Sequence, residues 1–138
     1  MTTETVLARV AEQIAESTGV AFVVRQQRSV AGGCINRATV LQDGARRFFV
    51  KLNDAARVSM FAAEAEGLKE IARHRAVRVP EPVCWGTAGD TAYLVLEYLE
   101  LAGVDARSLE QLGRQLAQMH RVTRDQFGWH LDNTIGSS

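Results

Sequence analysis

Two glycines and a lysine are the residues whose types and spacing best suit phosphate chemistry. Gly32 and Gly33 lie in the turn Ala31-Gly32-Gly33-Cys34, between two β-rich runs. Because glycine has no Cβ, backbone N–H groups in such a turn can approach phosphate oxygens closely. Lys51 lies in a further β-rich run, FFVKLN, where its ammonium group can bind the same phosphates. The pattern predicts a phosphate site; a plain hairpin turn and a solvated edge lysine are the alternative interpretations.

A lysine that grips phosphates needs a carboxylate to hold its ammonium group in place. The stretch MFAAEAEGL at 60–68 supplies Glu64 and Glu66, and Glu70 follows shortly after. At about 100° per residue on a helix, Glu64 lies near the apolar face that contains Leu68, whereas Glu66 points away from it. We therefore predict that Glu64 is the partner of Lys51, with the other two glutamates as competitors.

Three helices are predicted around these residues. Apolar residues at helical spacing indicate a helix from about residue 3 to 17, ended by Gly19, and a second one to about residue 74 with Asp54 as its N-cap. Ser108 and Gln111 form a capping-box pattern that begins a third helix, SLEQLGRQLAQMHR. The last segment, from Asp125 on, has no clear periodicity and is expected to be loop.

Five β-rich runs predict the strands of one antiparallel sheet and hence an α+β fold. They read FVVRQQRSV, RATVLQ, ARRFFVKLN, VCWGT and TAYLVLEYL. The dipeptide Asp43-Gly44 predicts a type I′ hairpin turn, with positive φ at both residues. Gly89 and Asp90 predict the turn before the last strand. The prolines Pro80 and Pro82 indicate an extended segment that enters an edge strand.

This order of elements is that of the small lobe of a protein kinase, with an N-terminal helix and a C-helix around the five-stranded sheet. On that template the strand end LVLEYLEL becomes a hinge. The carbonyl of Glu97 and the N–H of Leu99 would bind adenine, with Leu96 at the back of the pocket. A buried strand followed by an ordinary loop is the alternative interpretation.

Seven stretches resemble the N-terminal half of the fructosamine (ketosamine) kinases, a branch of the phosphotransferases that also include aminoglycoside and choline kinases. In chain order they are GGCIN at 32–36, FFVKLN at 48–53, MFAAEAEGL at 60–68, VRVPEPVCWG at 77–86, LVLEYLEL at 94–101, LGRQLAQMHR at 112–121 and FGWHLDNTIGSS at 127–138. The last stretch is the one most characteristic of this family. The order and spacing of all seven identify the resemblance.

The resemblance implies an ATP- and Mg2+-dependent transfer of the γ-phosphate to a hydroxyl of a ketosamine, typically the 3-hydroxyl, which starts deglycation. The ATP-binding residues it implies are Gly32, Gly33, Cys34, Lys51, Glu64, Leu96, Glu97 and Leu99. Residues 1–99 would form the nucleotide-binding small lobe, and residues 100–138 the hinge connector and the start of an incomplete larger lobe. The partners expected are therefore ATP and a ketosamine or glycated amine.

The family's catalytic loop has no counterpart in this sequence. Such kinases use an HGD-type motif with an aspartate base and a following asparagine, and a second aspartate for magnesium. Neither Asp125 nor Asp132 lies in such a motif, and His120 is expected at a helix end. We expect the chain to be an inactive fragment, with its catalytic and magnesium-binding residues beyond Ser138. No metal site is predicted in the chain itself.

Two features suggest self-association. Leu109, Leu112, Leu116 and Met119 form an apolar face on the third predicted helix, and we expect this face to be exposed when a larger lobe is missing. Cys34 lies in the glycine turn, where backbone N–H groups can favour a thiolate and an intermolecular disulfide can form. The alternative is that a small residue simply suits the turn.

Composition excludes several other classes of protein. The chain has 138 residues, of which 46% are hydrophobic, and a formal net charge of zero, so neither a nucleic-acid surface nor a basic membrane patch is indicated. The two cysteines have no CxxC spacing, which argues against a zinc site or a disulfide scaffold. The start has no apolar core of signal-peptide length, so a cytoplasmic location is expected. A kinase of another small alcohol and a non-catalytic kinase-like interaction domain remain as alternative functions.

Overall fold

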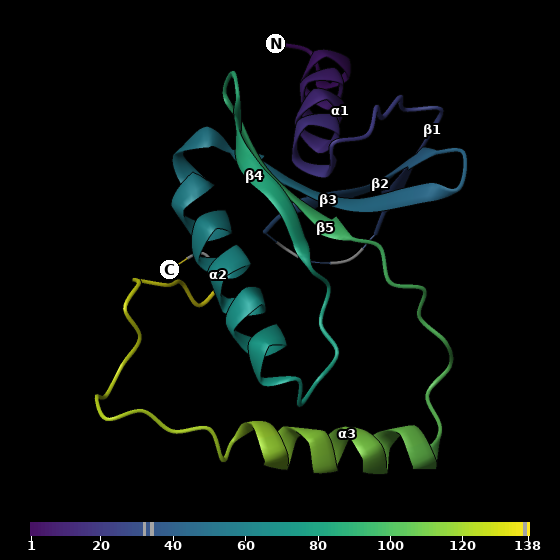
Figure 1. Cartoon of the computed structure of the whole chain (residues 1–138). Helices are drawn as coiled ribbons and strands as arrows, with labels where there is room; N and C mark the ends of the chain where they lie inside the picture. Colours follow the sequence, from purple (N-terminus) through teal and green to yellow (C-terminus); the bar gives the residue numbers. More distant parts are fainter. Residues whose placement is uncertain (32, 34, 137) are drawn as a thin grey trace.

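The computed structural model describes residues 1–31, 33, 35–136 and 138 (Figure 1). In chain order the elements are α1 (Thr3–Thr18), β1 (Gln26–Val30), β2 (Arg37–Asp43), β3 (Arg46–Asp54), the 3-10 turn η1 (Ala55–Arg57), α2 (Val58–His74), β4 (Pro82–Ala88), β5 (Thr91–Glu97) and α3 (Ala106–Met119). The predicted order of helices and strands is confirmed. So is the α+β class with one five-stranded antiparallel sheet.

The sheet has the strand order β1-β2-β3-β5-β4, so β5 lies between β3 and β4. All six residues from Thr91 to Leu96 are buried, which shows that this strand is covered on both faces. Successive side chains of a strand point to opposite faces. The residues of β3 and β5 therefore sort into two sets, one for each helix that packs on the sheet.

The first face packs against α1. Val6, Val10 and Ile14 of the helix are buried with Leu41, Val50, Leu52, Tyr93 and Val95 of the sheet. Thr2 caps the start of α1, because its hydroxyl accepts a hydrogen bond from the N–H of Thr5. Gly19 ends the helix with a φ of 71°, as predicted. This face forms the larger part of the hydrophobic core.

The second face packs against α2. Phe61 and Ala65 of the helix are buried against Ala92, Leu94 and Leu96 of β5, with Phe49 of β3 beside them. Asp54 caps the 3-10 turn that leads into α2, because its carboxylate accepts from the N–H of Ala56 at 2.9 Å. Asp54 was predicted as the N-cap of the helix itself, but the N-cap position of α2 is Arg57, because the 3-10 turn comes between them. The buried residues of α2 all lie in the first half of the helix.

The hairpin between β2 and β3 differs from the prediction. Its two turn residues are Gly44 and Ala45, not Asp43 and Gly44. Gly44 has a φ of 54°, and Ala45 is not among the residues with positive φ, so a type I′ turn is excluded. Asp43 instead pairs with Arg46 as the last residue of β2, which moves the turn one residue along the chain.

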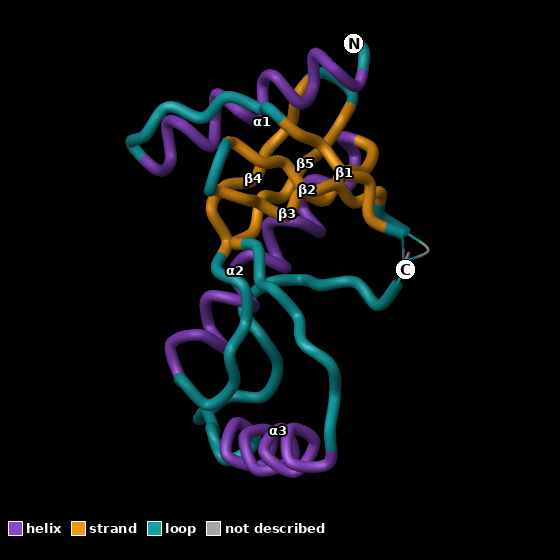
Figure 2. Tube along the Cα trace, turned by 90° about the vertical axis from the view of Figure 1, so that its right-hand side faces the viewer, coloured by secondary structure: helices purple, strands orange, loops and turns teal. Residues whose placement is uncertain are grey.

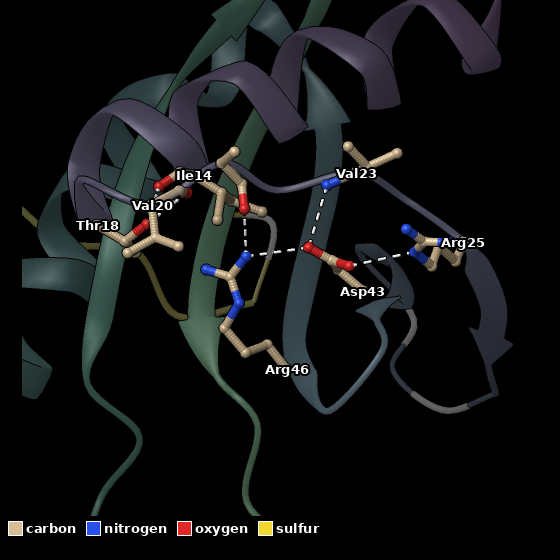
Figure 3. A network of polar contacts seen from close by, with 8 residues as sticks. Ile14, Thr18, Val20, Val23, Arg25, Asp43 and Arg46 are labelled. Carbon is tan, nitrogen blue, oxygen red and sulfur yellow. Dashed lines mark hydrogen bonds and ion pairs between the residues drawn. The ribbon is translucent and has the colours of Figure 1, made fainter.

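The first predicted strand also begins too early, since β1 starts at Gln26 rather than at Phe22. Asp43 accepts a hydrogen bond from the N–H of Val23 at 3.3 Å, and Arg46 donates to the carbonyl of Ala21 (Figure 3). The backbone at Ala21 and Val23 is therefore bound by side chains of the β2–β3 hairpin and is not part of strand β1. The ring of Phe22 is buried in the core and lies edge-on to Phe48.

The third helix begins earlier than predicted. Asp105 is its N-cap and accepts from the N–H of Ser108 at 2.7 Å, while the Ser108 hydroxyl accepts from the N–H of Asp105 at 3.0 Å. The capping box is therefore Asp105 with Ser108, and the predicted pair of Ser108 with Gln111 is wrong. Asp105 competes successfully because an aspartate is among the best N-cap residues. His120 is the C-cap of α3, the helix-end position predicted for it.

The helix α3 lies apart from the sheet in both views (Figures 1 and 2). It has no buried side chain, and Leu109, Leu112 and Leu116 of its apolar face are exposed, as expected. The described part of the segment that follows has neither helix nor strand and runs back toward α2. Among the described residues, no helix combines the length and the apolar character needed to cross a membrane.

Candidate functional site

The predicted pair of Lys51 and Glu64 is present. The Nζ atom of Lys51 lies 2.7 Å from Oε1 and 3.0 Å from Oε2 of Glu64. Lys51 is opposite Leu94 in the sheet register and so points to the face on which α2 packs. About a quarter of the lysine side chain is exposed, 24%, and 30% of the glutamate. The ammonium group is thus fixed by a carboxylate and still accessible to a ligand.

The other two glutamates of α2 have different partners. Glu66 binds Lys69 at 3.3 Å on the exposed side of the helix. Glu70 binds Arg124 and the indole N–H of Trp129. The choice of Glu64 from its position on the helix is therefore confirmed as a contact.

A cavity of about 580 Å³ opens beside this pair. Its floor follows the sheet register, because Arg28 is opposite Val40, Val40 is opposite Phe49 and Phe49 is opposite Leu96. These four side chains form one row across the sheet, and Val30 and Lys51 belong to the next row on the same face. The helix α2 packs on the β4–β5 part of this face, and the cavity lies over the β1–β3 part.

Residues 97–101, which follow β5, form one wall of the cavity. Leu96, Glu97 and Leu99, which were predicted as the adenine site, all line it, together with Tyr98, Glu100 and Leu101. The walls are mostly apolar, as expected for a pocket that holds a flat base by contact and by backbone hydrogen bonds. One cavity therefore joins the predicted hinge to the predicted phosphate-binding lysine.

The hinge is held in place by side chains of neighbouring segments. The Glu97 carboxylate binds Arg78 at 2.5 Å and accepts from the backbone N–H of Glu81 at 3.1 Å. The hydrogen bond from Arg78, with that from Glu81, holds the pKa of the Glu97 carboxyl below its ordinary value. On the other side Arg47 lies over the ring of Tyr98, 4.4 Å from its centroid. The carboxylate of Glu97 is thus held by both Arg78 and the backbone of Glu81.

The glycine turn is described in part. Gly32 and Cys34, two of the predicted site residues, lie outside the described residues. Gly33 has a φ of 90°, a conformation that favours glycine, and a Cβ built there would meet no atom within 4 Å. The end of the turn is tied to β3, because the side-chain amide of Asn53 donates to Oδ1 of Asn36 at 2.7 Å and to the carbonyl of Ile35 at 3.3 Å.

Several residues of the site were missed by the sequence predictions. Arg28, Val30, Val40 and Phe49 line the cavity, and Asn53 anchors the turn. The period of two along each strand places Phe49 and Asn53 on the same face as Lys51, and this pattern alone would have identified them. The contribution of β1 depends on register across strands, which the sequence pattern does not determine.

A larger cavity, of about 840 Å³, lies on the opposite face between α1 and residues 21–24. Its charged lining groups are Glu4 and Glu12, which would repel phosphate oxygens. We therefore assign the candidate site to the smaller cavity, since it contains the lysine. The described residues contain no cluster of three or more His, Cys, Asp or Glu side chains that could hold a metal ion.

Comparisons with known proteins give consistent matches. The model of the fructosamine kinase family matches residues 6–138. The "Probable ketoamine kinase slr1563" of Synechocystis sp. is 45% identical over 130 residues, which cover 94% of this chain and 44% of that protein. The chloroplastic protein-ribulosamine 3-kinase of Arabidopsis thaliana is 41% identical over 125 residues, 87% of this chain and 37% of that protein. The chain thus spans less than half the length of these relatives.

The crystal structure of a "Putative fructosamine-3-kinase" from Haemophilus somnus 129PT superposes with a TM-score of 0.91. The superposition covers 98% of this chain and 46% of that one, at 24% sequence identity. It confirms the predicted fold over almost the whole chain. Together with the family match over almost the whole sequence, it leads to one conclusion: the chain belongs to the fructosamine kinase family.

Proposed function

We propose that the complete protein transfers the γ-phosphate of ATP to a sugar hydroxyl of a ketosamine, and that this chain holds the nucleotide. The relatives at 45% and 41% identity are named as a ketoamine kinase and a protein-ribulosamine 3-kinase, which supports this substrate class over another small alcohol. Residues 1–99 form the nucleotide-binding lobe in this proposal. Residues 100–138 form the connector and the start of the larger lobe.

The observation that carries the proposal is the position of the Lys51–Glu64 pair in the cavity. Lys51 and the hinge residues line the same space of about 580 Å³, which suits a nucleotide. We place adenine against Leu96, with the Glu97 carbonyl and the Leu99 N–H as its hydrogen-bond partners. The phosphates then reach Lys51 and the backbone N–H groups of the turn at Gly32, Gly33 and Cys34.

The chemical contribution of these residues is positioning and charge stabilisation. Phosphoryl transfer depends almost entirely on holding the phosphates in line and on neutralising their developing charge. The Lys51 ammonium supplies one positive charge, and Glu64 fixes where that charge lies. Mg2+ is the metal that this chemistry requires. In this proposal its ligands and the catalytic base belong to the part of the relatives' length that this chain does not span.

Titration calorimetry of this chain with Mg-ATP tests the nucleotide site. Lys51→Ala should weaken the affinity at least about tenfold, because a charge-assisted contact to phosphate is lost. Lys69→Ala is the matched control, since Lys69 is an exposed lysine on α2 that contacts Glu66. We expect the control to bind within about twofold of the wild type. Equal affinities for the two variants and the wild type would show that the cavity is not the nucleotide site.

A substrate panel on the complete protein tests the reaction. Phosphorylation of a ketosamine such as a ribulosamine or fructosamine is expected, and the aminoglycoside and choline classes should react far more slowly. Preference for an aminoglycoside would reject the proposed substrate class and leave the nucleotide site intact.

A further inference from the structure

Trp129 makes a contact that the nucleotide cavity does not include. Its indole N–H donates to Oε2 of Glu70 on α2 at 2.6 Å, across 59 residues of sequence. Arg124 binds the other oxygen of the same carboxylate. The hydrogen bond from Trp129, and then the charge of Arg124, hold the pKa of Glu70 below its ordinary value. Only 21% of the Glu70 side chain is exposed. The segment after α3 is therefore bound to α2 by charge-assisted hydrogen bonds to a partly buried carboxylate.

The contact lies in the second half of α2, which contains none of the buried residues of this helix. The buried residues of the helix are Phe61, Ala63 and Ala65, all in its first half. Gly67, Glu70, Ile71 and His74 follow at helical spacing and line a cavity of about 350 Å³ together with Met119, Val122, Trp129 and Asn133. One side of the second half of α2 thus faces the segment after α3, while Leu68 of the same half packs against the core.

Trp129 also lies close to the turn of α2 that carries Glu64. A Cβ built on Gly67 would lie 3.9 Å from the end of the Trp129 ring, so the ring packs over this glycine. Gly67 follows Glu64 by three residues and therefore lies on the same side of the helix. Because a helix moves as a rigid unit over such a short distance, a shift at Gly67 and Glu70 would carry Glu64 with it.

The same segment continues to the glycine turn. A Cβ built on Gly136 would lie 3.8 Å from Cδ1 of Ile35, the residue whose carbonyl binds Asn53. In both views the segment runs from α3 back to α2 (Figures 1 and 2). Residues 121–136 therefore contact both elements that surround the phosphate end of the cavity.

We propose that Trp129 is a positioning residue for the nucleotide site: its hydrogen bond to Glu70 fixes the second half of α2 and thereby holds Glu64 on Lys51. This inference rests on the proposed nucleotide function of the cavity. Trp129 does not line that cavity, so its effect on affinity is transmitted through α2. Thermodynamic linkage makes the effect reciprocal, because a nucleotide bound at Lys51 must stabilise the Trp129–Glu70 contact by the same factor.

The first test is a double-mutant cycle on Mg-ATP affinity, measured by calorimetry on this chain. Trp129→Phe keeps an aromatic ring and removes the N–H donor, and Glu70→Met removes the acceptor. Each should weaken affinity about fivefold, and the double variant no more than either single one. Trp85→Phe is the matched control, because Trp85 is an exposed tryptophan on β4 outside the cavity, and its affinity should stay that of the wild type.

The second test measures hydrogen exchange of the Trp129 indole N–H by NMR in the Trp85→Phe variant, with and without Mg-ATP. Slower exchange with nucleotide is expected, and a residue needed only for folding would not show this dependence. The measurement also decides the case in which Trp129→Phe fails to fold.

The outcomes separate the two proposals. Three results would each overturn the positioning role. They are an unchanged Mg-ATP affinity in Trp129→Phe, additive losses of affinity in the double-mutant cycle, and an indole exchange rate that is the same with and without nucleotide. If Lys51→Ala still loses affinity in the same experiments, the proposed nucleotide site stands without it. If Lys51→Ala binds as well as the wild type, the proposed function fails and the positioning role fails with it.

Discussion

Two regions of the molecule, the sheet with α1 and α2 and the separate helix α3, have helices with similar amphipathic patterns, but they differ in burial. Val10, Ile14 and Phe61 of the first two helices are fully buried. Leu109 of α3, on an equally clear apolar face, is 57% exposed. Amphipathic spacing therefore predicts a helix and its apolar side in both regions. Whether that side is covered depends on what else the chain provides.

The two regions are also stabilised by different kinds of interaction. The first region is stabilised by packing, because both faces of β5 are covered by helices. α3 depends on local interactions, chiefly the capping box at Asp105 and the ion pair of Glu110 with Arg114 at 2.8 Å. Local interactions of this kind contribute little compared with burial of a leucine.

The largest expected effect is a contrast between two identical substitutions. Leu41→Ala, at a fully buried position of β2, should lower the free energy of unfolding by about 2–5 kcal/mol, because it leaves a cavity in the core. Leu109→Ala in α3 should change it by less than about 0.5 kcal/mol, because little area is uncovered. Urea unfolding monitored by tryptophan fluorescence measures both. A large loss for Leu109→Ala would show that its face is covered in solution, for example by the predicted self-association.

A smaller contrast comes from the helical glycines Gly67 and Gly113. An alanine at Gly67 would contact Trp129 at 3.9 Å, and one at Gly113 would meet no atom within 4 Å. Each substitution should favour its helix by about 0.5–1 kcal/mol through the lower conformational entropy of the unfolded chain. We expect Gly67→Ala to raise the urea midpoint of the sheet region. Gly113→Ala should raise helical circular dichroism and leave that midpoint unchanged, and a common shift for both would mean that the two regions unfold together.

The smallest contrast appears on acidification. Asp43 accepts from the N–H of Val23 and binds Arg46 and Arg25, and Asp105 accepts from the N–H of Ser108. These hydrogen bonds lower the pKa of both carboxyls below the ordinary value of 3.8. A lowered pKa stabilises the folded state above the ordinary value, and this stabilisation is lost as the pH falls through the lowered one.

The variants Asp43→Asn and Asp105→Asn measure how much each carboxylate stabilises the folded state at a given pH. Each difference from the wild type should be constant between pH about 7 and about 5 and should shrink below 3.8. We expect Asp43→Asn to affect the urea midpoint of the sheet and Asp105→Asn to affect only the helical signal of α3. A difference that already changes above pH 5 would point to another titrating group.

The sequence patterns predicted elements well and exact partners less well. The period of 3.6 residues distinguished Glu64 from Glu66 as the partner of Lys51, because both lie on one helix whose inner face is visible in the sequence. The cap of α3 was misplaced because Ser108 satisfies the capping pattern at two registers and only the backbone shows that Asp105 is the N-cap. The roles of Arg28 and of Trp129 could not be predicted, since each depends on segments that meet only in the folded chain.

The predictions on Gly32, Cys34, the adenine contacts and the domain boundary at residue 99 stay predictions. So do the redox role of Cys34, the self-association and the cytoplasmic location. They concern ligands, partners or residues that the described structure does not contain. Calorimetry with Mg-ATP tests the predicted nucleotide contacts. Non-reducing gels of the wild type against Cys34→Ser test the redox role of Cys34.

The strand order has a consequence for how the site comes into existence during folding. β2 with β3, and β4 with β5, are hairpins closed by two-residue turns, so each can form quickly and locally. The pairing of β3 with β5 must instead close a loop that contains the whole of α2, which is slower because of the entropy of loop closure. The floor of the cavity spans this junction, since Phe49 belongs to one hairpin and Leu96 to the other. We therefore expect nucleotide affinity to appear only in the last kinetic phase of refolding, after most secondary structure has formed.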